Sequence, residues 1–407
     1  MFPALAITFL AFLLRIFNLS TPKGLVFDEL YYVDGARDYL KYGVELTDGK
    51  AEFVVHPPVG KWLIAAGIKL FGDNEFGWRI AVAIAGTLTV YLTAKIAQRI
   101  FHENKWATLA ALLMTLDGLN LVMSRTALLD IFLTLFVLLS VNAWLKGNYL
   151  SLAIYLGLAM GSKWSGIYFV AILLILEFAL NRKLIRILKV GTTSALVYLS
   201  SWVGWFSSSN GWDRNSKSNP LASLINYHQE MLNFHTGLTE KHSYQANPWS
   251  WIVMGRPTSF YYQSPKGCGA KSCAQEVLAI GTPILWWIGA MALLFLIGAN
   301  LHNFAMRELD LGVLIPFIGI LAGYLPWFFF QERTVFAFYA IVFQPFLILA
   351  IVLLAKVAYE YHQNFKYLIG LFVILIAWNF IYFYPLFTGS ITTYDAWLAK
   401  MWWSSWI

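Results

Sequence analysis

The sequence is poor in charge. Only 13% of its 407 residues are Asp, Glu, Lys or Arg, whereas 59% are hydrophobic. Soluble domains carry about twice that share of charged residues, so a soluble globular protein of this length is excluded. We predict a polytopic membrane protein, because a bilayer core needs about 20 apolar residues per helix and such runs recur from Phe2 nearly to Pro385.

A polar stretch of domain size is also lacking. Independent domains have on the order of 100 residues, and no segment between the apolar runs is that long. We therefore predict a single transmembrane domain over residues 1–407, with a first outer loop at 20–75 and a long outer loop at 207–277. The first apolar run lacks a basic start and a small-residue cleavage site, so we expect a retained span and not a cleaved signal peptide.

Acidic residues are outnumbered by basic ones, and the formal net charge is +7. Most basic residues lie in short loops between apolar runs, where they act as topology determinants, and this placement excludes a nucleic-acid partner. Cysteine is scarce too, with only Cys268 and Cys273 present, close together in the long outer loop. They form a disulfide if that loop faces an oxidising compartment and stay free thiols otherwise.

Apolar length and its interruptions predict about eleven spans. They cover residues 2–19, 76–101, 106–122, 128–146, 149–160, 165–180, 187–206, 278–300, 311–330, 334–359 and 367–384. Two short spans within 149–180 are favoured over one, because they bring the basic loop residues to the same side of the membrane. The N-terminus is then cytoplasmic, and the C-terminus and the chemistry are extracytoplasmic.

Three further stretches outside the spans are candidates for helices: residues 31–42 have helical spacing with a polar and an aromatic face, and residues 59–71 form a short apolar stretch. Residues 31–42 and 59–71 lie in the first outer loop, and residues 220–237 lie in the long outer loop, where apolar residues recur at three- and four-residue steps. We predict that all three are helices lying in the membrane interface.

Ionisable side chains near the outer ends of the spans are costly to bury and are therefore candidates for function. They are Arg79, Asp117, Arg125, Asp130, Lys163, Glu332 and Arg333. The first outer loop adds the adjacent carboxylates Asp28 and Glu29, and His56 before two prolines. Carboxylates can take a proton from an acceptor hydroxyl and cations can hold a phosphate leaving group, so this set suits a glycosyl-phosphate reaction.

Several of these residues also have a structural interpretation. Asp117 and Asp130 can form interhelical ion pairs with Arg125 or Arg79. Arg333 can act as a topological anchor and His56 as part of a rigid loop.

Lys163 lies in a turn between two short spans. Non-helical backbone is tolerated there only where it is buried in protein or lines a cavity, which favours a functional lysine. His228 and His235 share a helical face, but without an adjoining carboxylate such a pair is more often a cavity wall than a metal site.

A series of motifs, in order along the chain, carries a resemblance to a known family. The motifs are LVFDELYYVDGARDYL, HPPVGKW, FGWRI, DGLNLVMSRTALLDIF, GSKWSG, HQEMLNFHTGL, NPWSWIVMGRP, the two cysteines, ERTVFAFY and TTYDAWLAKMWWSSWI. Together they cover essentially the whole chain, which resembles the bacterial branch of the protein O-mannosyltransferases.

The resemblance implies an all-α polytopic glycosyltransferase of the GT-C type in the cell membrane. Its donor would be polyprenyl-phosphate-mannose, and its acceptors would be Ser or Thr hydroxyls of exported polypeptides. Transfer would be a single inverting displacement. No cofactor or metal is required by this chemistry, although a divalent ion held by Asp28 or Glu29 stays open.

The family's essential Asp-Glu pair falls on Asp28 and Glu29. We expect Asp28 to be the general base and Glu29 to orient the acceptor or the sugar. The expected phosphate-binding residues are Arg125, Lys163 and Arg333. Supporting roles are expected for Arg79, which matches the family's arginine in the second span, and for His56, Asp117, Asp130 and His235.

Two other functions stay open at this point. One is a GT-C transferase that moves a polyprenyl-linked sugar to a lipid or a cell-wall glycan, because its carboxylates and cations would look the same. The other is a lipid transporter or flippase, whose intramembrane charges would couple ions. The clustering of charges at one face and the lack of repeated halves speak against the second.

Overall fold

Helices occupy all the predicted spans in the computed structural model, which describes residues 1–407. They are α1 (Phe2–Ile16), α4 (Glu75–Phe101), α5 (Asn104–Thr115), α7 (Asp130–Leu145), α8 (Tyr149–Ser162), α9 (Gly166–Asn181), α10 (Leu184–Ser200), α13 (Pro283–Met306), α14 (Leu311–Tyr324), α15 (Gln344–Tyr361) and α16 (Phe365–Thr388). By length and composition, α4, α13, α15, α16 and α14 with its continuation to Phe329 can each cross a membrane. Shorter apolar helices accompany them, namely α1, α7, α8 and α9.

The third predicted span is broken. Its first part, α5, has 12 residues and is about 18 Å long at 1.5 Å per residue, too short for a bilayer core. The chain turns at Asp117 and continues as α6 (Gly118–Met123), whose first turn is capped by the Asp117 carboxylate. The break therefore brings polar groups into the bundle.

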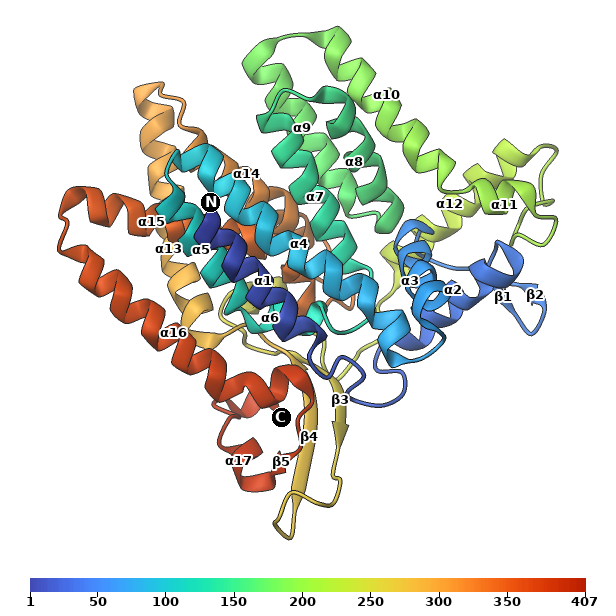
Figure 1. Cartoon of the computed structure of the whole chain (residues 1–407). Helices are drawn as coiled ribbons and strands as arrows, with labels where there is room; N and C mark the ends of the chain where they lie inside the picture. Colours follow the sequence, from blue (N-terminus) through green and yellow to red (C-terminus); the bar gives the residue numbers. More distant parts are fainter.

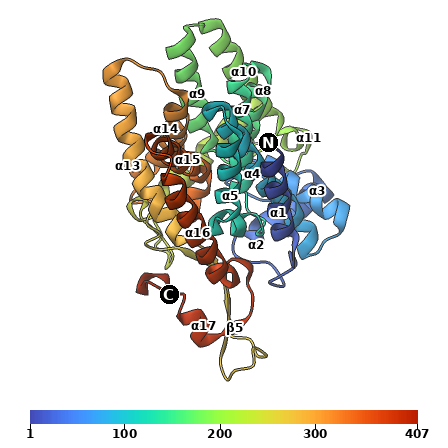
Figure 2. The same cartoon turned by 60° about the vertical axis from the view of Figure 1, so that its left-hand side comes forward.

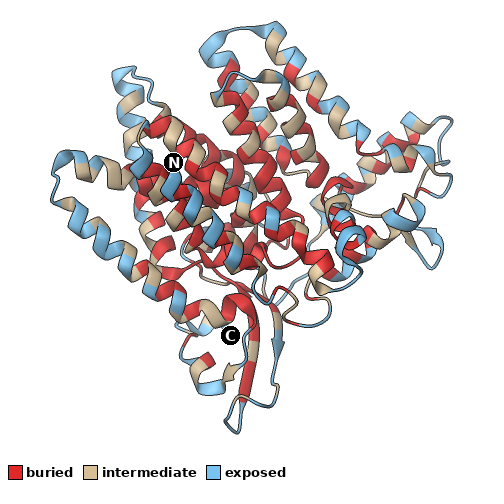
Figure 3. Ribbon diagram, in the orientation of Figure 1, coloured by how far each residue is buried: buried red, intermediate tan, exposed pale blue.

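Burial separates the central helices from the peripheral ones. In α4, 67% of the most apolar window is buried, compared with 22% in α16. Figure 3 shows the same contrast, with buried residues concentrated in the middle of the bundle and exposed ones along α16 and α10. Exposed apolar residues on long peripheral helices are expected where lipid replaces water as the surroundings.

The bundle has two distinct ends (Figures 1 and 2). At one end lie the turns after α4, α7, α9, α13 and α15, which carry most of the basic loop residues; we call it the basic end. At the other end lie the Asp28 loop, the α8–α9 turn and the long segment between α10 and α13; we call it the loop end.

The three helices predicted outside the spans are present at the loop end. They are α2 (Glu29–Tyr42), α3 (Val59–Phe71) and α12 (Pro220–Gly237). Helix α2 packs on α3, and α3 packs on α4. The first outer loop is therefore folded against the helix bundle. Short elements complete this end: α11 (Val203–Ser207), α17 (Tyr394–Leu398), and the 3-10 turns Pro248–Ser250, Leu325–Phe329, Ala337–Val342 and Ser404–Trp406.

Small antiparallel sheets, which the sequence did not predict, interrupt the otherwise helical chain. One pairs β1 (Leu46–Thr47) with β2 (Lys50–Ala51). The other has the order β3-β4-β5, formed by Thr258–Gln263, Cys273–Ala279 and Thr392–Thr393. Because the end of β4 is apolar, the predicted span 278–300 began too early; α13 starts at Pro283. Likewise α15 starts at Gln344 and not at residue 334.

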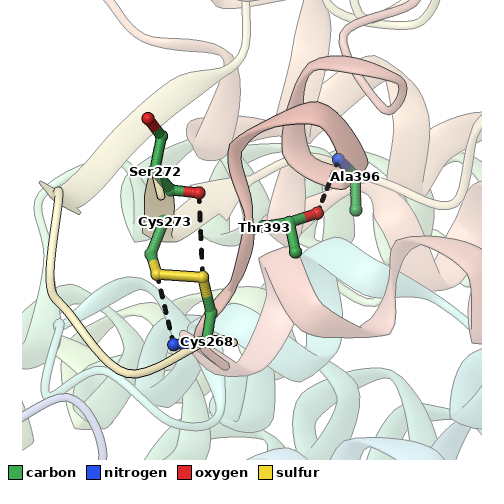
Figure 4. The surroundings of a disulfide bond; sticks show 5 residues. All are labelled: Cys268, Ser272, Cys273, Thr393 and Ala396. Carbon is green, nitrogen blue, oxygen red and sulfur yellow. Dashed lines mark hydrogen bonds between the residues drawn. A yellow bond between two sulfur atoms is a disulfide. The ribbon is translucent and has the colours of Figure 1, made fainter. Parts of the chain in front are cut away.

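The two cysteines form a disulfide at the tip of the β3–β4 hairpin. Figure 4 shows the bridge beside the strand that carries Thr393. The Thr393 hydroxyl accepts a hydrogen bond from the Ala396 backbone nitrogen at 3.2 Å and so begins α17. Of the two states left open for the cysteines, the structure has the bonded one.

Candidate active site

The Glu29 carboxylate is fully engaged in a buried ion pair with Arg79. Arg79 Nε lies 2.8 Å from Oε1 and Nη2 lies 2.8 Å from Oε2, and neither side chain is exposed. The backbone nitrogens of Ala127 and Val26 donate to the same carboxylate at 2.8 and 3.0 Å. The remaining Arg79 donors bind carbonyl oxygens of the loop after α1, those of Leu19, Pro22 and Gly24. This pair fastens the loop that carries Asp28 to α4 and to the segment before α7.

The neighbouring Asp28 carboxylate has almost no partners. Asp28 precedes α2 but does not cap it, and its side chain accepts one long hydrogen bond, from the Tyr32 hydroxyl at 3.4 Å. The preceding residue, Phe27, has a φ of 50°, a left-handed backbone that is uncommon outside glycine, and its ring stacks on Phe260 at 4.5 Å. Asp28 is thus half-buried with free acceptor capacity.

Burial raises the pKa of Asp28 to about 6. The positive charge of Lys163 opposes the shift and the negative charge of Asp130 adds to it. A carboxyl group with this pKa is mostly ionised at neutral pH and still basic enough to accept a proton in a transition state.

Lys163 occupies the turn between α8 and α9, and it is buried there. Its Nζ lies 2.8 Å from Asp130 Oδ1 at the start of α7 and 4.2 Å from the centre of the Tyr339 ring. The other oxygen of Asp130 is buried without a hydrogen-bond partner. The ammonium group therefore joins three elements at one point, and its Asp130 partner keeps one free acceptor.

A cavity of about 310 Å³ opens beside Lys163. Its walls come from the loop before α3, from α9, from α12 and from the segment after α14. The lining residues are His56, Lys163, Trp164, Ser165, Ile167, Tyr168, Leu232, His235, Thr236, Trp327, Phe330, Arg333 and Tyr339. This volume is at the small end of the range of about 300–1,000 Å³ typical of ligand sites, and the mixture of apolar wall with a few charges is also typical.

His235 and Arg333 are neighbours in the wall of this cavity. The His235 Nε2 donates to the Val55 carbonyl at 2.8 Å, which leaves Nδ1 as the acceptor for Arg333 Nη2 at 3.4 Å. Burial lowers the pKa of His235 to about 4, so the ring is neutral at pH 7. The Arg333 Nε is buried and unpaired, which leaves the guanidinium with donor capacity for a ligand.

His56 lies beside these groups, 5.3 Å from the His235 ring and 5.9 Å from the Tyr32 ring between centroids. Burial lowers its pKa well below the usual value, and nearby cations including Lys163 act in the same direction. Its Nδ1 is buried without a partner. The structure thus brings together five of the expected residues in one region: Asp28, Lys163, Asp130, His235 and Arg333, with His56 at the edge of the same cavity.

Arg125, an expected phosphate-binding residue, lies apart from these groups. Its Nη1 donates to the carbonyls of Arg15 at 2.8 Å and Phe17 at 2.7 Å, and its Nη2 to that of Asn18 at 2.8 Å. It is almost fully buried and is not part of the cavity wall. The residue caps the C-terminal end of α1, because a helix end leaves carbonyl groups that need donors.

Asp117, expected to have a supporting role, also lies apart from the cavity wall. Its oxygens accept from the Asn120 backbone nitrogen at 2.7 Å and from the Trp286 indole nitrogen at 2.5 Å. It therefore pairs with neither Arg125 nor Arg79, the partners considered from the sequence. Glu332 is exposed and does not line the cavity.

The two histidines of α12 have separate places. His228 binds the Leu224 carbonyl at 2.7 Å and the Tyr198 hydroxyl at 2.6 Å, and the Trp164 indole donates to the same hydroxyl at 2.9 Å. No group of three or more His, Cys, Asp or Glu side chains is positioned to hold a metal ion. His228 is therefore part of a hydrogen-bonded roof over the Lys163 turn.

Several residues of this region were missed from the sequence. Tyr339 follows Arg333 by six positions in the same motif, and Tyr32 lies one helical turn after Asp28; that spacing was the available signal. Lys61 and Glu45 form a buried ion pair within the first outer loop, and Lys61 was visible as one of the two lysines in the apolar run 59–71. Its carboxylate partner came from a distant turn and could not be identified by spacing.

Solved structures share this fold. The S. cerevisiae protein O-mannosyltransferase Pmt1-Pmt2 complex bound to the sugar donor superposes with a TM-score of 0.82 at 15% identity, covering 100% of this chain and 92% of that one. ArnT from Cupriavidus metallidurans in the apo state gives 0.56 at 18% identity over 87% of this chain and 58% of that one. These likenesses define the fold class, that of a multi-span membrane protein of the GT-C type.

Sequence relatives narrow this class to one family. Family models described as "Dolichyl-phosphate-mannose-protein mannosyltransferase" match residues 5–74 and 55–205, and one described as the "C-terminal four TMM region of protein-O-mannosyltransferase" matches 220–406. The polyprenol-phosphate-mannose--protein mannosyltransferase of Mycolicibacterium smegmatis is 32% identical over 98% of this chain and 92% of its own length. That of Corynebacterium glutamicum is 29% identical over 94% and 88%. The chain belongs to the protein mannosyltransferase family, which confirms the resemblance found in the motifs.

Proposed function

We propose that this protein transfers mannose from polyprenyl-phosphate-mannose to Ser or Thr hydroxyls of exported polypeptides, on the extracytoplasmic side of the cell membrane. The observation that carries the proposal is the Asp28 carboxylate, which has free acceptor capacity and a pKa raised to about 6 in the same electrostatic cluster as Lys163. The donor and the protein acceptor are those of the bacterial relatives, which are polyprenol-phosphate-mannose--protein mannosyltransferases.

The reaction is a single displacement at the anomeric carbon. The oxygen of the acceptor Ser or Thr hydroxyl forms the new bond to that carbon, and Asp28 accepts the proton that this hydroxyl loses. The bond from the carbon to the phosphate oxygen breaks, and polyprenyl phosphate leaves with the electron pair. One base and one leaving group suffice, so the configuration inverts and no covalent enzyme intermediate forms.

The cavity cations stabilise the departing phosphate. Lys163 is fixed by Asp130 and Tyr339, and Arg333 has an unused Nε. Both are buried or half-buried, where a fixed positive charge interacts more strongly with developing negative charge than it would in water. Neutral His235 holds Arg333 in place without adding a competing charge.

Glu29 acts as a positioning residue in this proposal. Both of its oxygens are engaged by Arg79 and by backbone nitrogens, so it has no free acceptor directed at substrate. Together with Arg79 it fixes the loop that presents Asp28. This differs from the direct role in orienting substrate that we expected from the sequence.

The proposed reaction needs no metal. Lys163 and Arg333 can offset the charge of the leaving group, and the residues around Asp28 do not form a group of three metal ligands. Full turnover after exhaustive chelation is the expected result. Complete loss of turnover, with recovery on addition of one specific divalent ion, would overturn the metal-free version.

The decisive experiment compares wild type, Asp28→Asn and Asp34→Asn in isolated membranes. Labelled mannose is supplied as polyprenyl-phosphate-mannose and transfer to a Ser/Thr-rich peptide is measured at equal protein abundance. Asp34 is a matched control, because it lies on α2 as an exposed partner of Arg37. Removing a general base is expected to lower transfer by at least about a hundredfold, whereas Asp34→Asn should retain nearly all activity. Wild-type activity in Asp28→Asn would contradict the role of Asp28 as general base. Label in lipid or glycan instead of peptide would mean that the acceptor is not a protein.

The proposed orientation has its own test. Cys268 and Cys273 are the only cysteines, and their disulfide lies at the loop end. In intact cells without an outer barrier, a membrane-impermeant reductant followed by an impermeant maleimide should label the wild type, and a Cys268→Ser/Cys273→Ser variant should stay unlabelled. Labelling that requires permeabilised cells would reverse the orientation.

A further inference from the structure

A second cavity lies at the basic end, far from the proposed active site. It has a volume of about 540 Å³ and is formed between the first half of α10 and the start of α8. The lining residues are Tyr149, Leu150, Ala153, Lys183, Ile185, Arg186, Lys189, Val190 and Thr193. Figure 1 shows the α9–α10 turn at the top of the molecule. Helix α8 starts at this cavity and ends directly before Lys163, so the two cavities lie at opposite ends of α8.

The charge of this cavity is of one sign. Three of its residues are cationic, and no Asp or Glu lines it. Arg186 is neutralised in part by Glu177 at 2.6 Å and also donates to the Tyr149 hydroxyl at 2.7 Å. Lys183 and Lys189 are exposed and take part in no ion pair. Helix α10 has no acidic residue in its first turn, so no carboxylate of its own competes for these lysines.

Most of the remaining wall is apolar and open outward. Leu150 is 66% exposed and Ile185 is 71% exposed, and both lie on helices that occupy predicted spans. A ligand that satisfies this surface needs an anionic head beside the cations and hydrocarbon against the leucine and isoleucine. Free phosphate would meet only the first requirement.

We propose that this cavity binds the headgroup of an anionic phospholipid, with its acyl chains along α8 and α10. Charge complementarity carries the proposal: basic pockets between membrane helices bind lipid phosphates, and each interfacial Lys or Arg contributes to the attraction. The simpler alternative is that Lys183, Arg186 and Lys189 serve only as topology determinants. That explanation accounts for the charge but not for a cavity of this size lined by it.

The same helices reach the proposed active site. Helix α8 ends directly before Lys163, and α10 carries Tyr198, which binds Trp164 of the same turn at 2.9 Å. Midway, the Ser194 hydroxyl donates to the Ala153 carbonyl at 3.0 Å, and a side chain at Gly157 would collide with α10 backbone. A lipid held at the basic end therefore braces the helix pair that supports the Lys163 turn. Lipid binding itself does not depend on the proposed reaction.

The test uses purified full-length protein, delipidated and titrated with phosphatidylglycerol or phosphatidylcholine, with bound lipid counted by native mass spectrometry. Lys183→Gln/Lys189→Gln removes the two free cations. The matched control, Arg307→Gln/Lys366→Gln, removes two exposed cations at the same end that do not line the cavity. Phosphatidylglycerol should bind more tightly than phosphatidylcholine, and the cavity variant should weaken it by roughly thirtyfold while the control changes it by less than about threefold.

Further arms identify the source of the phosphate. Raising the salt concentration should weaken phosphatidylglycerol binding to wild type and have little effect on the cavity variant. Equal loss in both variants, or equal binding of both lipids, would overturn the proposal. So would displacement of phosphatidylglycerol by millimolar inorganic phosphate, which would assign a free anion, or by an equimolar amount of polyprenyl phosphate, which would assign the product of the reaction.

Discussion

Two adjacent carboxylates, Asp28 and Glu29, lie in opposite surroundings. Glu29 accepts two hydrogen bonds from Arg79 and two from backbone nitrogens, and it is completely buried. Asp28 accepts one long hydrogen bond and lies next to the cavity cluster of Lys163, Asp130 and Tyr339. Two consecutive residues thus differ completely: the hydrogen-bond acceptors of Glu29 are all occupied, whereas those of Asp28 are available.

The difference between Glu29 and Asp28 explains how the first outer loop can be held rigidly and still present an available carboxylate. A buried ion pair with every partner in place fixes geometry but has no capacity left for substrate. An under-coordinated carboxylate keeps its basicity but depends on its neighbours for orientation. The Glu29–Arg79 pair supplies that orientation, and the predictions below separate the two roles.

The largest effect on stability is expected from Glu29→Gln. The change leaves Arg79 as a buried, uncompensated charge, which costs about 3–5 kcal/mol. We expect a marked fall in the melting temperature and in the yield of folded protein, measured in detergent. Asp28→Asn is the comparison and should melt no lower than wild type. A Glu29→Gln protein of full stability without activity would place Glu29 in direct contact with substrate.

Lys163→Met should lower kcat/KM by roughly tenfold to a hundredfold, because a charge-assisted contact to the leaving phosphate is lost. Asp130→Asn removes the ion-pair partner of Lys163 but keeps the positive charge that contacts the leaving phosphate. The activity of this variant should therefore stay within about fivefold of wild type. The measurement is the kinetics of donor turnover for both variants. Equal losses would mean that the ion pair is structural, like Glu29–Arg79.

The activity should depend on pH through Asp28. Its pKa is raised to about 6, and only the ionised form can accept a proton. Transfer should therefore be flat above pH 7 and fall below pH 6, to roughly a tenth at pH 5. The residual activity of Asp28→Asn should lack this inflection. A profile for that variant with the wild-type inflection would assign the titration to another group.

The same shift sets the pH dependence of stability. Because the folded pKa lies above the ordinary value of 3.8, burial favours the protonated carboxyl. The stabilising contribution of Asp28 is complete below pH 4 and is lost as the pH rises through 6. Asp28→Asn should therefore be more stable than wild type at pH 8 and equal to it at pH 4, as measured by thermal unfolding. The reverse order would contradict the assigned environment.

The smallest effect is expected at the β3–β4 hairpin, which belongs to neither region. Cys268→Ser/Cys273→Ser opens a bridge across only five positions, so the change is local, and activity should stay within about twofold of wild type. Peptide transfer by the purified variant checks this. A large loss would show that the hairpin takes part in acceptor binding.

The spans and the outer-loop helices could be predicted because their signals are local. Apolar length marks a span and also α3, helical spacing marks α2, and three- and four-residue steps mark α12. The β3-β4-β5 sheet was missed because only three residues separate the apolar end of β4 from α13, so the end of the strand was counted as part of the span. The start of α15 was misplaced for a similar reason, since the 3-10 turn Ala337–Val342 is as apolar as the helix.

The candidate residues could be chosen by charge but not assigned to roles. Arg125 and Lys163 look alike in sequence, each a cation near the end of a span. Only the contacts separate them: Arg125 donates to the carbonyls that end α1, whereas Lys163 faces a cavity.

By itself the sequence determined that this protein is a multi-span membrane enzyme with an acidic pair in its first outer loop, because hydrophobic length and motif order are one-dimensional properties. Only the tertiary structure decided which acid of the pair is free. The two carboxylates are chemically almost identical and adjacent in the chain. Their difference arises from Arg79 of α4 and the backbone at Ala127, 50 and 98 residues from Glu29, which saturate one carboxylate and leave the other available.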